Sequence, residues 1–334
     1  MELSIVTTLY CSAPHLEEFS RRVCVAAEKI TRDFEVILVN DGSPDRSLDV
    51  ALSLALRDAR VKVIDLSRNF GHHKAMMTGL AHARGELVFK IDCDLEEDPA
   101  ELVGFHAAIK ESGADAVYGV QEARKGGWWE RISGMLFWKL FNALSSVPVP
   151  ANLLTVCIMT RKYVASLVRH QEREVFMAGL SAITGFKQVS RVVTKHSRGQ
   201  STYTLRRKVA LLVNAITSFS NKPLVLIFYL GTFICFVSGA IALYLILNAF
   251  FFQGYLMGWP SLVVSIWFLG GVIIFCLGII GIYLSKIFME TKQRPYTIIR
   301  DLYDRSEAAN SRALARGNAG ERLDGYWDRV KAGK

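Results

Sequence analysis

The segment ELVFKIDCDLEEDP, from Glu86 to Pro99, begins with an apolar run and ends in closely spaced carboxylates. Its apolar spacing is typical of a central strand in a parallel sheet, and ligands of open α/β sheets bind just beyond the carboxyl ends of such strands. Clustered acids repel one another unless they share a cation, and Mg²⁺ or Mn²⁺ prefers oxygen ligands that include nucleotide phosphates. Taken alone, the segment is equally compatible with a solvated acidic loop followed by a helix that begins at Pro99.

The rest of the first 220 residues alternates between strand and helix patterns, and this length is enough for one large domain. Such alternation predicts βαβ units, and therefore an α/β domain whose mostly parallel sheet is covered on both faces. The expected strands are residues 3–8, 35–39, 61–66, 87–91 and 116–120. The expected helices are residues 16–31, 47–57, 74–83 and 99–110.

The chain has no Asp, Glu, Lys or Arg between Lys222 and Lys286. Two apolar segments, about 224–251 and 262–285, each exceed the roughly 20 residues that cross a bilayer core. We therefore expect a transmembrane helical hairpin over residues 223–288. Cations flank the hairpin on both outer sides and are absent from its turn, so the positive-inside rule places both ends in the cytoplasm.

The segments beside the hairpin lead to three further expectations. Residues 206–222 are amphipathic and are expected to form an interfacial helix, whereas residues 128–144 suit either a membrane-surface helix or a core helix. Residues 289–334 are expected to form a cytoplasmic tail. The net charge of +9 is concentrated near the membrane flanks and in the tail, which favours anionic lipid and phosphate substrates over nucleic acid.

Two more strands end in polar residues that can take part in ligand binding. The strand at 35–39 leads into Asn40-Asp41-Gly42, where a carboxylate beside a glycine turn can accept hydrogen bonds from a base or ribose. The third strand leads to His72 and His73. Adjacent residues at the start of a helix face different directions, so we expect no shared zinc site there.

In their order along the chain, these motifs resemble the GT-A fold, family 2 glycosyltransferases, and among them the polyisoprenyl-phosphate glycosyltransferases related to dolichol-phosphate mannose synthase. The resemblance runs from about residue 3 to residue 298. Its marks are VNDGSPD at 39–45, SRNFGHHKAMMTGL at 67–80, IDCDLEEDP at 91–99, SRGQSTY at 197–203, ITSFSNKPL at 216–224 and ETKQRPY at 290–296.

The resemblance implies an inverting, metal-dependent hexosyltransferase of cell envelope glycan biosynthesis. It would move one sugar from a UDP- or GDP-linked donor to a polyisoprenyl phosphate at the cytoplasmic face of a membrane. The enzyme would be an integral protein of a bacterial inner membrane, with a GT-A catalytic domain at residues 1–205. Whether it forms a homo-oligomer, and which sugar, nucleotide and lipid length it uses, stay open.

The resemblance also assigns roles to individual residues. Asp92 and Asp94 match the catalytic DxD pair and, with Glu96, would bind Mg²⁺ or Mn²⁺. Residues expected to bind the nucleotide are Thr8, Leu9, Tyr10, Asp41, Asn69, Asp92 and Cys93. Residues expected to bind the acceptor phosphate are Arg124, Arg131, Arg198, Ser201 and Tyr203.

Two departures from the family pattern keep other functions open. The first-strand loop at Thr8 is altered, and Thr155 occupies a position where relatives often carry an acid, so no general base is visible. A catalytically impaired membrane scaffold is one alternative. A second is a membrane-bound enzyme that extends a polysaccharide, although the chain lacks the Gln-x-x-Arg-Trp motif and the additional spans which that activity predicts.

Overall fold

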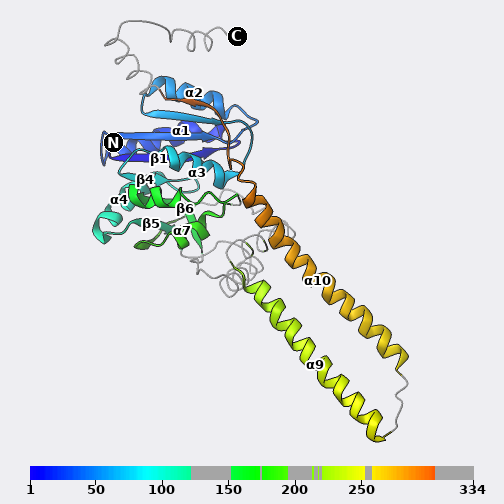
Figure 1. Cartoon of the computed structure of the whole chain (residues 1–334). Helices are drawn as coiled ribbons and strands as arrows, with labels where there is room; N and C mark the ends of the chain where they lie inside the picture. The colour runs from blue at the N-terminus through cyan, green and yellow to red at the C-terminus, as the bar shows by residue number, and fades with distance from the viewer. Residues whose placement is uncertain are drawn as a thin grey trace, which may run out of the picture.

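The computed structural model describes residues 1–121, 152–173, 175–194, 213, 217, 220–252 and 258–304. Within these residues, the chain forms one eight-stranded sheet with helices against both faces (Figure 1). The strands are β1 Leu3–Leu9, β2 Phe34–Asn40, β3 Val61–Leu66, β4 Leu87–Lys90, β5 Ala116–Val120, β6 Leu153–Thr160, β7 Gln188–Val192 and β8 Ile299–Tyr303. The helices beside the sheet are α1 Ala13–Glu28, α2 Ser47–Arg57, α3 His72–His82, α4 Glu101–Ser112, α6 Arg161–Leu167 and α7 Met177–Thr184.

The strand order is β7-β5-β6-β4-β1-β2-β3-β8, and its centre is parallel. β1 pairs in parallel with β2 and β4, and β2 pairs in parallel with β3. β6 lies antiparallel between β4 and β5, and β8 lies antiparallel to β3. The parallel centre agrees with the sequence-based prediction, but the two antiparallel strands make the sheet mixed, and neither of them was predicted.

The sheet is buried on both faces because alternate residues of each central strand enter different hydrophobic clusters. Ile5 and Leu38 pack with α1, α2 and α4, whereas the neighbouring residues Val6 and Val39 pack with α3, α6 and α7. Side chains of a strand point to opposite faces in turn, so a strand covered on both sides needs apolar residues throughout. The predicted strands and helices occur at the expected positions, with bounds that differ by at most three residues.

Local signals set several helix boundaries. α1 begins with a proline in its first turn, where a missing N–H is harmless. α4 ends at Gly113, whose φ of 58° is the left-handed conformation that glycine adopts without strain. Both helices pack on the same face of the sheet, against residues of β1, β2 and β4.

Two long helices, α9 Lys222–Phe252 and α10 Trp259–Thr291, extend side by side away from the sheet (Figure 1). Among the described residues, one segment, Ser265–Thr291, is long and apolar enough to cross a membrane, with a mean hydropathy of 2.4. α9 is 31 residues long and also apolar, and Lys222–Ile234 is the apolar segment of it that the described side chains cover. The helical hairpin therefore exists, while its two membrane spans stay a prediction. The interfacial helix expected at 206–222 lies almost wholly outside the described residues.

The chain returns to the sheet after α10. Residues 289–334 were expected to form a tail, yet Ile299–Tyr303 within them is strand β8 at the sheet edge. This part of the expected tail is ordered because its backbone forms hydrogen bonds with the edge of β3. The sheet thus includes residues on both sides of the helical hairpin.

Candidate active site

The carboxyl ends of four parallel strands meet at one edge of the sheet. Thr8 lies near the end of β1, Asn40 ends β2, Asp65 lies near the end of β3, and Asp92 follows β4 by two residues. In open α/β sheets this edge is where ligands bind, because loops there diverge and leave backbone groups exposed. The structure therefore brings together the polar residues that the sequence had indicated after separate strands.

The Asp-Cys-Asp turn is held against the end of β1. The Cys93 thiol donates a hydrogen bond to the Thr8 carbonyl over 3.2 Å. Burial raises the pKa of Cys93 to about 11, so this thiol stays neutral and acts as a structural link. Leu95 then adopts a φ of 60°, and the carboxylate of Asp94 accepts the Glu96 N–H over 2.9 Å.

The acids of this turn differ in their surroundings. Asp94 is exposed, whereas Asp92 is partly buried and its Oδ1 atom is buried without a hydrogen-bond partner. No group of three or more His, Cys, Asp or Glu side chains is arranged to hold a metal ion anywhere in the described part of the chain. Mg²⁺ commonly binds through one or two carboxylates plus substrate phosphates. An Asp92 oxygen that makes no hydrogen bond, beside an exposed Asp94, fits that kind of site.

His72 connects the end of β1 to Asp92. Its Nδ1 atom lies 2.9 Å from the Thr8 hydroxyl, and its Nε2 atom lies 3.5 Å from Asp92 Oδ1. If the Thr8 hydroxyl donates to Nδ1, the Nε2 atom carries the proton and faces the carboxylate. The sequence analysis considered His72 only as a zinc ligand and missed this role, because no local pattern shows that β1 and β4 are neighbours.

The neighbouring histidine faces elsewhere. His73 Nδ1 bonds to the Val175 carbonyl over 2.9 Å, and burial lowers the pKa of this imidazole. The two rings meet edge to face, with centroids 5.5 Å apart. His73 therefore attaches α3 to the loop before α7, while His72 faces the strand ends.

Asp41 holds the loop that follows β3. Its Oδ1 accepts the Phe70 N–H over 2.7 Å, and its Oδ2 accepts the Gly71 N–H over 3.0 Å. Burial raises the pKa of Asp41, although these two hydrogen bonds favour its charged form. Gly42 has a φ of 59°, and a Cβ atom there would lie 2.4 Å from the Asn69 backbone nitrogen. The turn after β2 and the loop after β3 thus pack backbone to backbone.

The other predicted nucleotide-binding residues line the same edge in different ways. Leu9 is fully buried in the core, and its carbonyl accepts the Asp41 N–H over 3.0 Å. Tyr10 is 53% exposed, and Asn69 is also exposed. Leu9 therefore contributes backbone to this edge, whereas Tyr10 and Asn69 present side chains to solvent.

A buried hydrogen-bond chain lies beneath the two loops. Asn40 Nδ2 donates to Asp65 Oδ1 over 2.7 Å, and Asn40 Oδ1 accepts the Ser43 N–H over 3.3 Å. The other oxygen of Asp65 lies 3.3 Å from Arg300 Nη1. Arg300 was missed in the sequence analysis because it follows the hairpin, some 230 residues after its partner.

The acceptor side of the site is described only in part. All five residues expected to bind the acceptor phosphate, Arg124, Arg131, Arg198, Ser201 and Tyr203, lie outside the described residues. Thr155 lies in β6, which pairs with β4 through Lys90↔Cys157. Thr155 lies two residues before Cys157 in this strand, so β6 leads past the end of β4 on the side of the Asp-Cys-Asp turn.

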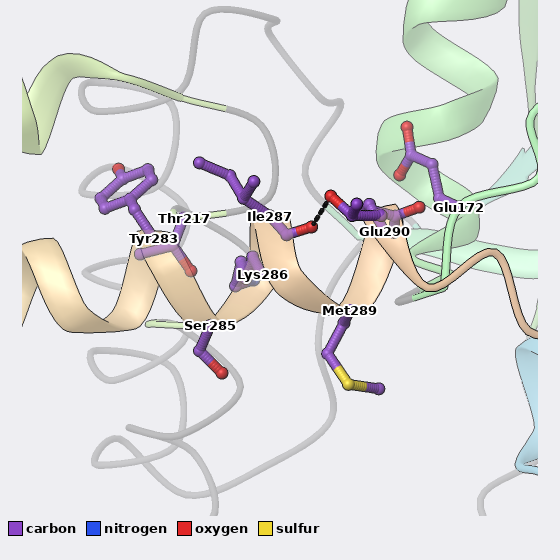
Figure 2. A pocket seen from close by; sticks show the side chains of 9 residues that line it. Glu172, Thr217, Tyr283, Ser285, Lys286, Ile287, Met289 and Glu290 are labelled. Atoms are coloured by element: carbon purple, nitrogen blue, oxygen red, sulfur yellow. Dashed lines mark hydrogen bonds between the residues drawn. The ribbon is translucent and has the colours of Figure 1, made fainter.

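A separate cavity of about 470 Å³ lies where α10 meets the sheet domain (Figure 2). Its lining includes Tyr283, Lys286 and Glu290 of α10, together with Glu172 from the loop before α7. Burial and the nearby Glu290 raise the pKa of Glu172. None of the strand-end residues lines this cavity, so it is distinct from the candidate active site.

Comparison with known proteins identifies the family. Residues 4–167 match the model of glycosyl transferase family 2. A putative glycosyltransferase of Mycobacterium tuberculosis is 57% identical over 91% of this chain and 89% of its own length. The chain belongs to glycosyl transferase family 2. Its matched segment contains β1 to α6 and, with them, Thr8, Asp41, Asp92 and Asp94.

Other relatives of this family 2 glycosyltransferase carry more specific names. The bactoprenol glucosyl transferase of Shigella phage SfV is 32% identical over 90% of this chain and 99% of its own length. A prophage bactoprenol glucosyl transferase homolog of Escherichia coli is 31% identical over 90% of this chain and 99% of its own length. Among solved structures, a mannosyltransferase of Pyrobaculum calidifontis overlaps with a TM-score of 0.46 and 17% identity, over 65% of this chain and 63% of its own. That overlap is too small to inform the function.

Proposed function

We propose that this family 2 glycosyltransferase moves one sugar from a nucleotide diphosphate sugar to the phosphate of a polyisoprenyl lipid, with inversion at the anomeric carbon. The observation that carries the proposal is the extent of the likeness to bactoprenol glucosyl transferases. It covers 90% of this chain and therefore continues past the family domain at 4–167 into the helical hairpin. A helical hairpin in the membrane agrees with an acceptor whose tail stays in the lipid.

The strand-end residues supply the donor side of this reaction. Exposed Tyr10 and Asn69, with the turn at Asp41, offer groups that can bind a base and ribose at the edge of the sheet. Asp92, Asp94 and Glu96 would hold Mg²⁺ or Mn²⁺, which when bound neutralises the diphosphate leaving group. His72 Nε2 lies 3.5 Å from Asp92 Oδ1 and would help to orient this carboxylate beside Thr8.

The acceptor needs little activation. A phosphate monoester is already largely ionised near pH 7, so it can attack without a strong general base. This chemistry is compatible with a threonine at position 155. The chain then contributes mainly by positioning the two substrates and excluding water.

The hairpin would hold the sheet domain at the membrane surface, where a soluble donor and a lipid acceptor can both reach the site. Segment Ser265–Thr291 is apolar and its side chains are not buried within the protein, as expected for contact with lipid tails. Lys286 and Lys292 lie at the end of α10 nearest the sheet domain, where the positive-inside rule favours the cytoplasmic face. The catalytic domain would work on that face.

The proposal is tested with membranes from cells that express the full chain. They are incubated with polyprenyl phosphate and a panel of UDP- and GDP-sugars, and the lipids are analysed by mass. We expect one donor to yield a lipid heavier by a single sugar residue. Products with several sugar residues would support polysaccharide extension instead, and no product with any donor would support the scaffold alternative.

We predict that His72→Ala reduces transfer by about 10–100-fold, a typical effect of removing a residue that orients a metal-binding carboxylate. The Mg²⁺ concentration that gives a half-maximal rate should rise, because Asp92 loses its link to Thr8. The matched control is His82→Ala at the other end of α3, where the imidazole bonds to the Thr78 carbonyl. An unchanged Mg²⁺ requirement in His72→Ala would contradict the role assigned to His72.

A further inference from the structure

The strand that follows α10 carries an arginine to the edge of the candidate active site. β8 pairs with β3, and the register shifts between Asp65 and Leu66, so that Arg300 is the extra residue of a β-bulge. A bulge bends its strand and redirects the extra side chain. Arg300 Nη1 lies 3.3 Å from Asp65 Oδ2, and Arg300 Nη2 donates to the Ser67 carbonyl over 2.7 Å.

The carboxylate that Arg300 meets is almost fully buried. The Asp65 side chain is 2% exposed, and its other oxygen accepts the Asn40 amide. A buried carboxylate is costly unless hydrogen bonds and a cation compensate for the lost water. Arg300 provides the cation, while its own side chain remains 55% exposed.

The loops after β2 and β3, at the edge of the sheet expected to bind the nucleotide, both depend on the contact between Arg300 and Asp65. Asn40 accepts the Ser43 N–H and so fixes the turn after β2, while Arg300 fixes the start of the loop after β3 at Ser67. The two loops are then joined by Asp41, which accepts N–H groups of the second loop. Releasing Arg300 would loosen both loops together.

The segment between α10 and β8 is itself attached to the sheet domain. Glu290, near the end of α10, accepts the Arg173 N–H over 2.7 Å. Thr297 Oγ1 lies 2.8 Å from the Thr78 hydroxyl of α3, and the Ile298 carbonyl accepts the Ser67 N–H over 2.9 Å. The path from the apolar helix to Arg300 is therefore short and fixed at several points.

We propose that Arg300 is a positioning residue of the donor site, which couples the placement of helix α10 to the loops that bind the nucleotide. The inference rests on the proposed function for the identity of the ligand, a nucleoside diphosphate sugar. It adds that the donor site is completed by a residue located after the membrane hairpin. Arg300 acts through Asp65 and Ser67 and does not touch the reacting atoms.

The first test is steady-state kinetics of full-length Arg300→Gln. The donor KM should rise by about tenfold, a typical effect of losing hydrogen bonds to a charged group, while kcat and the acceptor KM change little. The matched control is Lys292→Gln in the same segment, whose amine lies 4.0 Å from the Phe288 ring centre and is exposed. This control should keep the wild-type donor KM.

A rescue experiment separates positioning from general damage. Asp65→Asn removes the buried charge but keeps an oxygen that can accept the Asn40 amide. Once that charge is absent, Arg300 has less to compensate, so Arg300→Gln should raise the donor KM less in the Asp65→Asn background than in the wild type. Equal effects in both backgrounds would overturn the proposed coupling.

Amide hydrogen exchange tests the loops without any ligand. Exchange at Phe70 and Gly71 should be faster in Arg300→Gln than in the wild type and in Lys292→Gln. Unchanged exchange would overturn the inference, and so would faster exchange with an unchanged donor KM. If exchange is faster but no UDP- or GDP-sugar serves the wild type, the loop coupling is supported and the proposed function is overturned instead.

Discussion

Asp94→Asn is expected to reduce sugar transfer by on the order of 10²–10³-fold, as is typical when a charge that stabilises a leaving group is lost. Asp94 is exposed, and the amide oxygen of asparagine can still accept the Glu96 N–H that forms the turn. The fold should therefore persist while a metal-binding charge disappears. The measurement is the rate of lipid product formation by mass spectrometry, at saturating donor, together with membrane recovery of the protein.

The matched control for this variant is Asp115→Asn. Asp115 lies just before β5, away from the strand ends that form the site, and its carboxylate accepts the Lys187 N–H over 3.3 Å. We expect this variant to keep wild-type activity. In the wild type, EDTA should abolish transfer and excess Mg²⁺ should restore it. Retained turnover in Asp94→Asn would reject the metal assignment.

Lys62→Met is expected to destabilise the sheet domain by about 3–5 kcal/mol, the usual cost of removing one partner from a buried ion pair. The Lys62 amine lies 2.8 Å from both Glu35 Oε2 and Asp304 Oδ2, and all three side chains are at most 6% exposed. Without the amine, Glu35 loses its cation, and Asp304 keeps the partly exposed Arg84, whose Nη1 atom lies 3.7 Å from Asp304 Oδ2. Chemical unfolding of the detergent-solubilised protein, followed by tryptophan fluorescence, would measure the loss.

Lys29→Met is the control for Lys62→Met, because Lys29 is an exposed lysine at the end of α1. Its substitution should change the free energy of unfolding by no more than about 0.5 kcal/mol. Similar values for the two variants would show that the contact between β8 and the core contributes little. Asp304 follows β8, so the expected loss also measures how firmly the segment after the hairpin is attached.

The ion pairs of Lys62 and Asp65 with residues after the hairpin show that the sheet domain does not end at residue 205. A fragment of residues 1–205 would lack β8, and Lys62 would lose Asp304 while Asp65 lost Arg300. The edge of β3 would also lose its hydrogen-bonded neighbour, and such edges are prone to aggregation. The segment after α10 is therefore needed by the same sheet that begins at β1.

The sequence predicted the central strands and the first four helices because their signals are local. β2, for example, is mostly apolar and is followed by a turn at Gly42, and the helices carry apolar stripes. The Asp-Cys-Asp acids could be assigned for the same reason, since they directly follow such a strand. Parallel strands then necessarily bring their polar ends to one edge.

The residues that sequence analysis missed depend on contacts between distant segments. His72 matters because α3 begins beside both Thr8 and Asp92, which lie more than 80 residues apart. β8 is a short segment of five residues, and it is a strand because it pairs with the edge of β3. Neither fact leaves a periodic signal in the sequence, because the partner that stabilises each arrangement is remote.

Apolar periodicity and motif order by themselves determined the α/β class, the family 2 membership and the acids of the candidate site, since these follow from neighbouring residues. Only the tertiary structure decided that His72 lies between Thr8 and Asp92, close to both. It also decided that Arg300, beyond the hairpin, neutralises Asp65. The physical reason is that burying a charged side chain costs free energy unless an oppositely charged group lies beside it. Which residue provides that group depends on which strands become neighbours in the sheet.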